Sequence, residues 1–261
     1  MKKKDADVPV VLLSASEVVS SKHFPSMLLL ALSTGAVNAG AFAVCDRFVT
    51  HVTGNATRIG IDIGFLVLTL EYSMVLAAFI LGAMASVLAI QARALRGERP
   101  VHAAPLWGAA GILLAVTVLG VAGAFGPVGG AAEELPNFVF LSMIAFGMGL
   151  LNAGVASSTA LAVRTTHMTG PASDFGVNLA TALVSRGEDR AKAFQIAWLR
   201  GGKLLSFIMG AALMFPFVNA AGYIAFAAPA AVLIGVAVRS FMPSSVRLTR
   251  GLAMTSQLRA Q

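Results

Sequence analysis

A polar, histidine-containing motif occurs twice in this chain, each time inside a long apolar stretch. The first copy is RFVTHVTGNATRIGIDIG at residues 47–64, and the second is VRTTHMTGPASDFGVNLA at residues 163–180. A duplicated polar motif among apolar segments predicts a site formed between two similar halves of a membrane protein. The identical positions pair Thr50 with Thr166, His51 with His167, Thr53 with Thr169, Gly54 with Gly170, Ala56 with Ala172 and Gly60 with Gly176.

The similarity extends beyond the motif in both directions. Upstream, with two extra residues in the second copy, Asn38-Ala39-Gly40 aligns with Asn152-Ala153-Gly154. Downstream, after a longer insertion, FILGA at 79–83 aligns with FIMGA at 207–211. Residues aligned in this way are called matched positions below.

The composition is that of an integral membrane protein. The chain is 57% hydrophobic and 12% charged, with a mean hydropathy of +0.81, whereas soluble domains are about a quarter charged. Because lipid tolerates no open sheet, the apolar segments are expected to be helices. Eight such segments lie at about 25–45, 53–69, 72–92, 105–125, 137–158, 168–184, 203–220 and 222–241.

The net charge of +7 comes mainly from clusters of basic residues at the ends of these segments. Lys and Arg mark cytoplasmic loops, and no continuous basic face indicates a nucleic-acid partner. The segment 126–136 has no Lys or Arg, so it is expected outside. The basic clusters, expected inside, are Lys2–Lys4, Arg93/Arg96/Arg99, Arg164, Arg186/Arg190/Lys192 and Arg239/Arg247/Arg250.

Every basic cluster falls inside only if the second and sixth segments enter the membrane without crossing it. Each half then has three spans, so the second half is inverted relative to the first. The predicted fold is all-α, with six transmembrane helices and two re-entrant or broken half-helices in two inverted-topology repeats. The alternative is a parallel arrangement of four plus four spans. The expected organisation is an N-terminal cytoplasmic tail 1–24, a first repeat 25–125, an external linker 126–136, a second repeat 137–241 and a cytoplasmic tail 242–261.

A half-helix is expected to begin at each Thr-Gly pair, because threonine is a good N-cap residue. Thr53 and Thr169 are the expected caps. The leading amides of such helices are unpaired and carry partial positive charge, so they would suit an anion or a polar solute. We therefore predict a substrate site formed by Asn38, His51, Thr53, Gly54, Asn55, Asn152, His167, Thr169 and Gly170.

Charged and polar residues continue along both half-helices. Arg58 and Asp174 occupy matched positions with opposite charge, which suggests an ion pair between the two halves. Asp62 and Asn178 are expected at the same interface. Charges at membrane depth usually face a partner or an aqueous path, so the pair has either a structural or a substrate-handling role.

The motif histidines have two interpretations. Histidine changes charge near neutral pH, so His51 and His167 are candidates for a proton relay or gate. The alternative is a hydrogen-bonded structural role. No third ligand of suitable spacing accompanies them, and neither a metal nor a cofactor is predicted. His23 and His102 fall in the tail and a loop, where solvation is expected.

Glycines recur along the apolar segments, and close helix packing requires small residues. Close approaches between helices are expected at Gly35/Gly40, Gly60/Gly64, Gly149/Gly154 and Gly82/Gly210.

The stretch FVTHVTGN at 48–55, together with the later FILGA, resembles the YoaK family of bacterial membrane proteins, a family of unknown function. The resemblance covers about residues 25–241. The second copy departs from the first at Pro171, which replaces Asn55. The resemblance implies a multi-pass protein of the bacterial inner membrane with six spans and both termini in the cytoplasm, and it supplies no substrate.

The sequence thus predicts a transporter or channel for a small anionic or polar solute, not an enzyme. The expected partners are the lipid bilayer and a small solute or ion, and a homo-oligomer is compatible with this interpretation. Two alternatives remain at this point. One is an intramembrane or lipid-processing enzyme that uses His51 and His167, and the other is a non-transporting scaffold.

Overall fold

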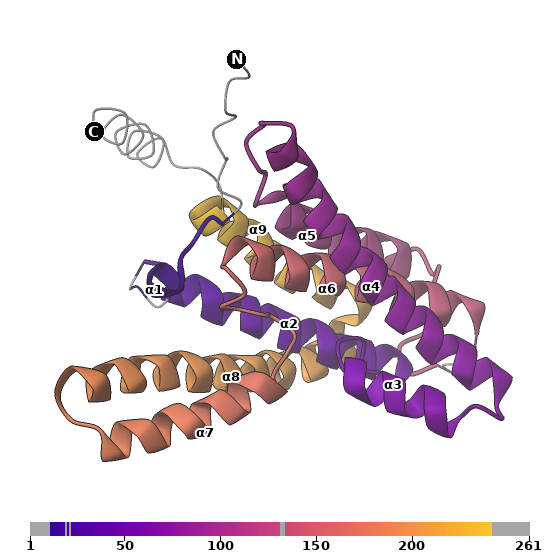
Figure 1. Ribbon diagram of the computed structural model, residues 1–261. Coiled ribbons are helices and arrows are strands. Elements are labelled where there is room, and N and C mark those ends of the chain that lie inside the picture. The colour runs from indigo at the N-terminus through magenta and orange to yellow at the C-terminus, as the bar shows by residue number, and fades with distance from the viewer. Residues whose placement is uncertain (1–10, 19, 21, 131–133, 242–261) are drawn as a thin grey trace.

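The computed structural model describes residues 11–18, 20, 22–130 and 134–241. These residues form helices and include no β-strand, in agreement with the composition. Figure 1 shows the arrangement. The α-helices are α1 (Ala15–Val18), α2 (Phe24–Cys45), α3 (Val52–Ile61), α4 (Leu66–Leu95), α5 (Ala104–Val121), α6 (Leu135–Ser158), α7 (Thr169–Val184), α8 (Gly187–Ala221) and α9 (Ala227–Val236). The 3-10 helix η1 (Gly222–Phe226) precedes α9, and the π-helix η2 (Ala237–Phe241) follows it.

In the described part of the chain, five helical stretches are long and apolar enough to cross a membrane, which makes this an all-helical membrane protein. They are α2, α4, α5, α6 and the continuous stretch Gly187–Phe241. Helices α3 and α7 have 10 and 16 residues. At about 1.5 Å per residue they are shorter than the hydrocarbon core of about 30 Å. Neither motif-bearing helix is therefore long enough to cross the hydrocarbon core by itself.

The last two apolar segments differ from the predicted boundaries. The segment expected at 203–220 belongs to α8, which begins at Gly187, because the polar residues before it continue the same helix alongside α7. Gly222 ends α8 with a positive φ of 60°, which glycine adopts without strain. The segment expected at 222–241 is then divided into η1, α9 and η2.

The helices pack in corresponding pairs. The two most extensive contacts are those of α2 with α8 and of α4 with α6. Each short helix lies along the long helix that follows it, α3 on α4 and α7 on α8 (Figure 1). Helix α5 packs on α6, α9 packs on α2, and α5 and α9 also contact each other. Because α2 and α6 carry matched residues, as do α4 and α8, the main contacts are the same in both halves.

Glycines make these two long contacts possible. A Cβ on any of four glycines would overlap a backbone carbonyl oxygen of the facing helix, and such an atom cannot move aside. This confirms close approach at these glycines. The contacts pair Gly35 with Phe207, its matched Gly149 with Phe79, Gly82 with Phe146, and its matched Gly210 with Leu32.

Gly60 and Gly64 do not have the packing role expected for them. A Cβ on either residue would meet no atom within 4 Å. This ridge of small residues therefore makes no close contact with the described part of the chain.

The described part of the N-terminal segment packs on the end of α6. The backbone N–H groups of Leu12 and Leu13 both donate to the carbonyl oxygen of Ser158, at 2.9 Å each. Leu13 and Val18 are buried in the hydrophobic core. The predicted tails at 1–10 and 242–261 and residues 131–133 of the predicted linker lie outside the described residues.

Two histidines outside the motifs are buried, although the sequence suggested that both are solvated. His23 Nδ1 is 3.3 Å from Ser240 Oγ, and His102 Nδ1 is 2.9 Å from Ser158 Oγ. The loop before α5 folds inward over the end of α6, so burial lowers the pKa of His102 to about 4. The expectation that both side chains are solvated, which rested on their positions in a tail and a loop, is therefore wrong.

Candidate functional site

Asparagines on α2 and α6 hold the segments that lead into the two motifs. Asn38 Oδ1 accepts hydrogen bonds from Thr50 N at 3.1 Å and from Thr50 Oγ1 at 3.0 Å. At the matched position, Asn152 Oδ1 accepts from Thr166 N at 3.2 Å. These bonds place each His-x-Thr-Gly segment against a long helix of its own half.

The motif histidines fold back over the first turn of the helix that follows each of them. A Cβ on Gly54 would lie 2.5 Å from His51 Nδ1, and a Cβ on Gly170 would lie 2.8 Å from His167 Cε1. Glycine at these positions therefore leaves the space that the imidazole rings occupy. Neither ring has a hydrogen-bond partner among the described residues, so the structure does not support the hydrogen-bonded structural role.

The half-helices begin close to the predicted places, but the threonines do not cap them. Helix α3 begins at Val52 and α7 at Thr169, and neither N-cap residue makes a side-chain cap hydrogen bond. Thr53 and Thr169 are instead within the first turn. Because the hydroxyl groups are not used to close the helix ends, they are available to the space in front of the helices.

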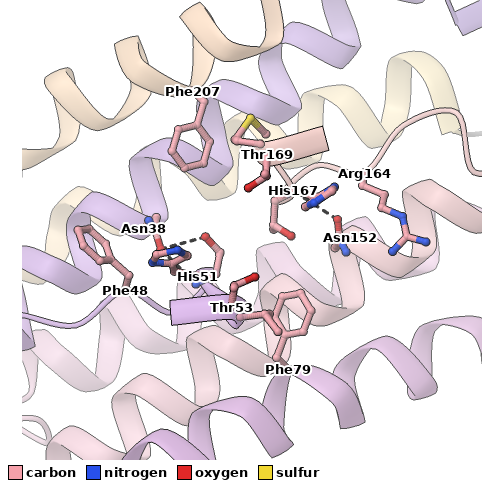
Figure 2. Close-up of a pocket in the computed structure, with 14 residues that line it drawn as sticks. Asn38, Phe48, His51, Thr53, Phe79, Asn152, Arg164, His167, Thr169 and Phe207 are labelled. Carbon is pink, nitrogen blue, oxygen red and sulfur yellow. Dashed lines mark hydrogen bonds between the residues drawn. The ribbon is translucent and has the colours of Figure 1, made fainter. Parts of the chain in front are cut away.

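A cavity of about 590 Å³ lies where the two motifs meet (Figure 2). Both halves of the chain contribute to it, and so do the beginnings of α3 and α7. All of its lining residues fall into matched pairs. The pairs are Asn38/Asn152, Phe48/Arg164, Thr50/Thr166, His51/His167, Val52/Met168, Thr53/Thr169 and Phe79/Phe207.

Six of the nine predicted substrate residues line this cavity: Asn38, His51, Thr53, Asn152, His167 and Thr169. The other three, Gly54, Asn55 and Gly170, are not among its lining residues. Gly170 lies beneath the ring of His167. Asn55 is buried, and its Nδ2 donates to the carbonyl oxygen of Phe48 at 3.3 Å. The amide of Asn55 therefore holds the chain that enters α3.

Sequence reasoning missed several residues of the cavity wall. Phe79 and Phe207 were visible in the second sequence match, but an apolar pair in a helix gave no signal of a site. Arg164 was noted as a marker of orientation only. The alignment of the two motifs could have identified it, because it matches Arg164 with Phe48, three residues before each motif histidine.

A second cavity of about 440 Å³ adjoins the first and shares Phe48 and His51 with it. These two rings meet edge to face, with centroids 6.4 Å apart. Phe48 also stacks on Phe42 at 4.7 Å. The remaining lining residues include Asp46, Arg47, Gly54, Asn55, Thr57, Arg58, Ile61 and Tyr72.

The predicted ion pair between Arg58 and Asp174 is wrong. Arg58 Nη1 lies 3.9 Å from Asp62 Oδ2 on the same helix, and Asp174 Oδ2 lies 3.3 Å from Arg200 Nε. Helix α3 packs on α4 and α7 packs on α8, so each charge meets a group of its own half. Asn178 Nδ2 donates to the carbonyl oxygen of Asp174 at 2.7 Å and so belongs to the same cluster.

Two further charged side chains are buried near the motifs. Glu71 is 1% exposed and lies 2.9 Å from Arg47 Nε. Lys203 is completely buried, and its Nζ donates to the carbonyl oxygen of Arg164 at 2.7 Å. Burying an ammonium group without a hydrogen-bond acceptor costs free energy. The bond from Lys203 to the Arg164 carbonyl is therefore favoured, and it holds the segment before the second motif against α8.

Comparison with known proteins identifies the chain by its family. The family model described as "Protein of unknown function (DUF1275)" matches residues 26–239. Neither a curated protein nor a solved structure matches the chain significantly. The match covers both motifs and all but the outermost two residues at each end of the spanning region. The chain therefore belongs to the DUF1275 family of proteins of unknown function, which includes the YoaK proteins that its motif resembles.

Proposed function

We propose that this protein is a transporter or channel for a small anionic or polar solute, and that the solute binds in the central cavity between the paired His-x-Thr-Gly motifs. One observation carries the proposal. A single cavity is lined by seven matched pairs of residues, so each half contributes an equivalent set of residues to its wall. A site shared between two similar halves is the usual arrangement in secondary transporters.

The proposed topology has six spans in two inverted repeats, with α3 and α7 re-entrant and both termini in the cytoplasm of a bacterial inner membrane. The corresponding packing of α2 on α8 and of α6 on α4 supports the repeat. The shortness of α3 and α7 supports re-entry. The stretch from η1 to η2 supplies the sixth span after the reversal at Gly222.

The polarity of the cavity favours transport over a scaffold role. The side chains of His51, Thr53, His167 and Thr169 are exposed, although the motifs lie among apolar helices. Polar groups at membrane depth are costly unless they face water or a ligand. A purely structural contact between the halves would bury or pair these groups.

The second cavity supports a route to the central one. It shares the Phe48 and His51 walls and is lined by polar and charged groups of α3 and its neighbours. These two side chains form the wall that the two cavities share. The pair is therefore proposed as the gate of this route.

Uptake into proteoliposomes tests the proposal, with small anions, neutral solutes and cations supplied from about pH 5.5 to 8, the range in which histidine changes charge. Saturable uptake by the wild type is expected. His51→Ala and His167→Ala should alter its pH dependence. Gly60→Ala, at an open position on α3, is the control and should transport normally.

A wild-type protein that is folded but moves no solute in the panel would contradict the transport proposal. Turnover of a lipid substrate that depends on His51 and His167 would instead indicate the enzyme. Absence of both activities would favour the scaffold.

A further inference from the structure

Arg164 gives the central cavity its charge. Of the residues that line the cavity, Arg164 carries a full positive charge at neutral pH, and the lining includes no carboxylate. The matched position is Phe48, which is apolar. Figure 2 shows the two on opposite sides of the cavity, with Arg164 beside Asn152 and His167. The two walls therefore differ chiefly in this guanidinium group.

The Arg164 guanidinium also has no polar partner among the residues that the structure describes. Its side chain is exposed, and within the described part of the chain it makes no hydrogen bond or ion pair. Only its backbone oxygen is engaged, by Lys203. Other arginines near the motifs each have a carboxylate. The distances are 2.9 Å for Arg47 to Glu71, 3.9 Å for Arg58 to Asp62 and 3.3 Å for Arg200 to Asp174.

Neighbouring charges leave this side of the cavity positive. Lys203 lies directly behind Arg164, and Arg200 donates to the carbonyl oxygen of Ala162 at 3.1 Å. Asp174 is the carboxylate paired with Arg200 in this cluster. Among these residues, the three cations Arg164, Arg200 and Lys203 thus outnumber the one anion, Asp174. Uncompensated positive charge in a partly enclosed space attracts anions more strongly than it would in water.

We infer that the cavity binds a small oxyanion, a carboxylate or a phosphate, and that the Arg164 guanidinium is the group that selects it; this rests on the proposed function. The planar guanidinium offers parallel N–H donors that match two oxygens of such a group. The exposed Thr53 and Thr169 hydroxyls and the first amides of α3 and α7 supply further donors. The volume of about 590 Å³ lies in the range of small-molecule sites.

The alternative is that Arg164 only marks the cytoplasmic side of the membrane. Arginines at loop ends do this regardless of any ligand. In that case replacement of Arg164 would leave anion binding unchanged. The two interpretations therefore differ in a direct binding measurement.

The experiment is isothermal titration calorimetry of the purified full-length protein in detergent, with acetate, inorganic phosphate, chloride and choline as separate probes. The wild type should bind acetate or phosphate more tightly than chloride, and should not bind choline. Arg164→Gln should weaken oxyanion binding at least about tenfold, as expected when a charged hydrogen bond is lost. Arg164→Lys should bind with intermediate affinity, because lysine keeps the positive charge but lacks the parallel N–H donors of the guanidinium group.

A charge-swapped variant keeps the test independent of folding defects. Phe48→Arg combined with Arg164→Phe moves the guanidinium to the matched position and should recover oxyanion binding that Arg164→Phe alone loses. Arg96→Gln removes an exposed arginine from the loop after α4 and should bind as the wild type does. Unchanged melting temperatures without ligand would show that the variants are folded.

Equal oxyanion affinity in the wild type and Arg164→Gln would overturn the inference, and so would a wild type that binds no oxyanion. The outcomes also separate it from the transport proposal. Oxyanion binding without flux would support Arg164 and reject transport. Flux of neutral solutes or cations without oxyanion binding would support transport and reject the role of Arg164.

Discussion

Asp174 on α7 pairs with Arg200 on α8, and their charged groups approach to 3.3 Å. Arg200 also donates to the carbonyl oxygen of Ala162, in the segment that leads into the second motif. The pair therefore joins the short helix, the long helix and the motif segment. The charge of Asp174 is thus balanced within its own half of the chain.

A double-mutant cycle measures this pair. Asp174→Asn and Arg200→Met should each lower thermal stability, with a coupling energy of about 0.5–1 kcal/mol, because both side chains are partly exposed. Arg200→Met should lower the thermal stability more than Asp174→Asn does, because it also removes the hydrogen bond to the Ala162 carbonyl oxygen. The Arg58→Met and Asp174→Asn cycle is the control and should be additive, because these two residues have separate partners.

Alanine at the contact glycines should destabilise the fold. Gly82→Ala and Gly210→Ala would each drive a methyl group into a backbone carbonyl of the facing helix, and overpacking of this kind costs about 1–3 kcal/mol or more. Thermal unfolding in detergent measures the loss. Gly176→Ala, on an open face of α7, is the matched control and should be neutral or stabilising by up to about 1 kcal/mol. Equal behaviour of both classes would contradict the close packing of the long helices.

Alanine at the motif glycines should instead preserve the fold and impair the site. A Cβ at Gly54 or Gly170 meets the ring of a histidine, which can rotate aside, unlike a carbonyl. The displaced imidazole would enter the central cavity. Gly54→Ala and Gly170→Ala are therefore expected to melt near the wild-type temperature and to lose most solute uptake, with Gly60→Ala as the control. Normal uptake in both variants would exclude a role for the ring positions.

Acid stability should depend on His102. Its pKa is lowered by burial from 6.5 in free histidine to about 4, so the unfolded chain binds the proton more tightly. The stabilisation is complete above about pH 6.5 and is lost as the pH falls to about 4. One pKa unit corresponds to about 1.4 kcal/mol, so the full loss is about 3 kcal/mol.

Melting temperatures measured between pH 4 and 7 test this prediction. His102→Gln should show a flatter pH dependence than the wild type. Ser158→Ala removes the hydrogen-bond partner and keeps the titrating group, so it should lower the melting temperature at pH 7 and retain the pH dependence. A wild-type profile that is flat over this range would show that His102 does not titrate with folding.

Local sequence determined those features that depend on composition and spacing along one segment. Apolar segments of bilayer length predicted helices, and α2, α5 and α6 begin and end close to the predicted residues, whereas α4 begins at Leu66, six residues before the predicted start. The duplicated motif predicted two short helices with a shared polar site, and a cavity lies between them. Gly82 and Gly210 could be identified because close helix approach requires residues without a side chain.

Features that depend on which helices are neighbours were decided by the tertiary structure. Arg58 and Asp174 are matched in sequence, but their helices pack on α4 and α8. Asp174 therefore pairs with Arg200 of α8, and Arg58 lies 3.9 Å from Asp62 at the end of its own helix. His102 lies in a loop by sequence and is buried because that loop covers the end of α6. Arg164 reads as an orientation marker until folding places it beside Asn152 and His167. Coulombic and packing energies depend on distances in space, and residues such as His102 and Ser158, which are 56 positions apart, acquire those distances only when the helices assemble.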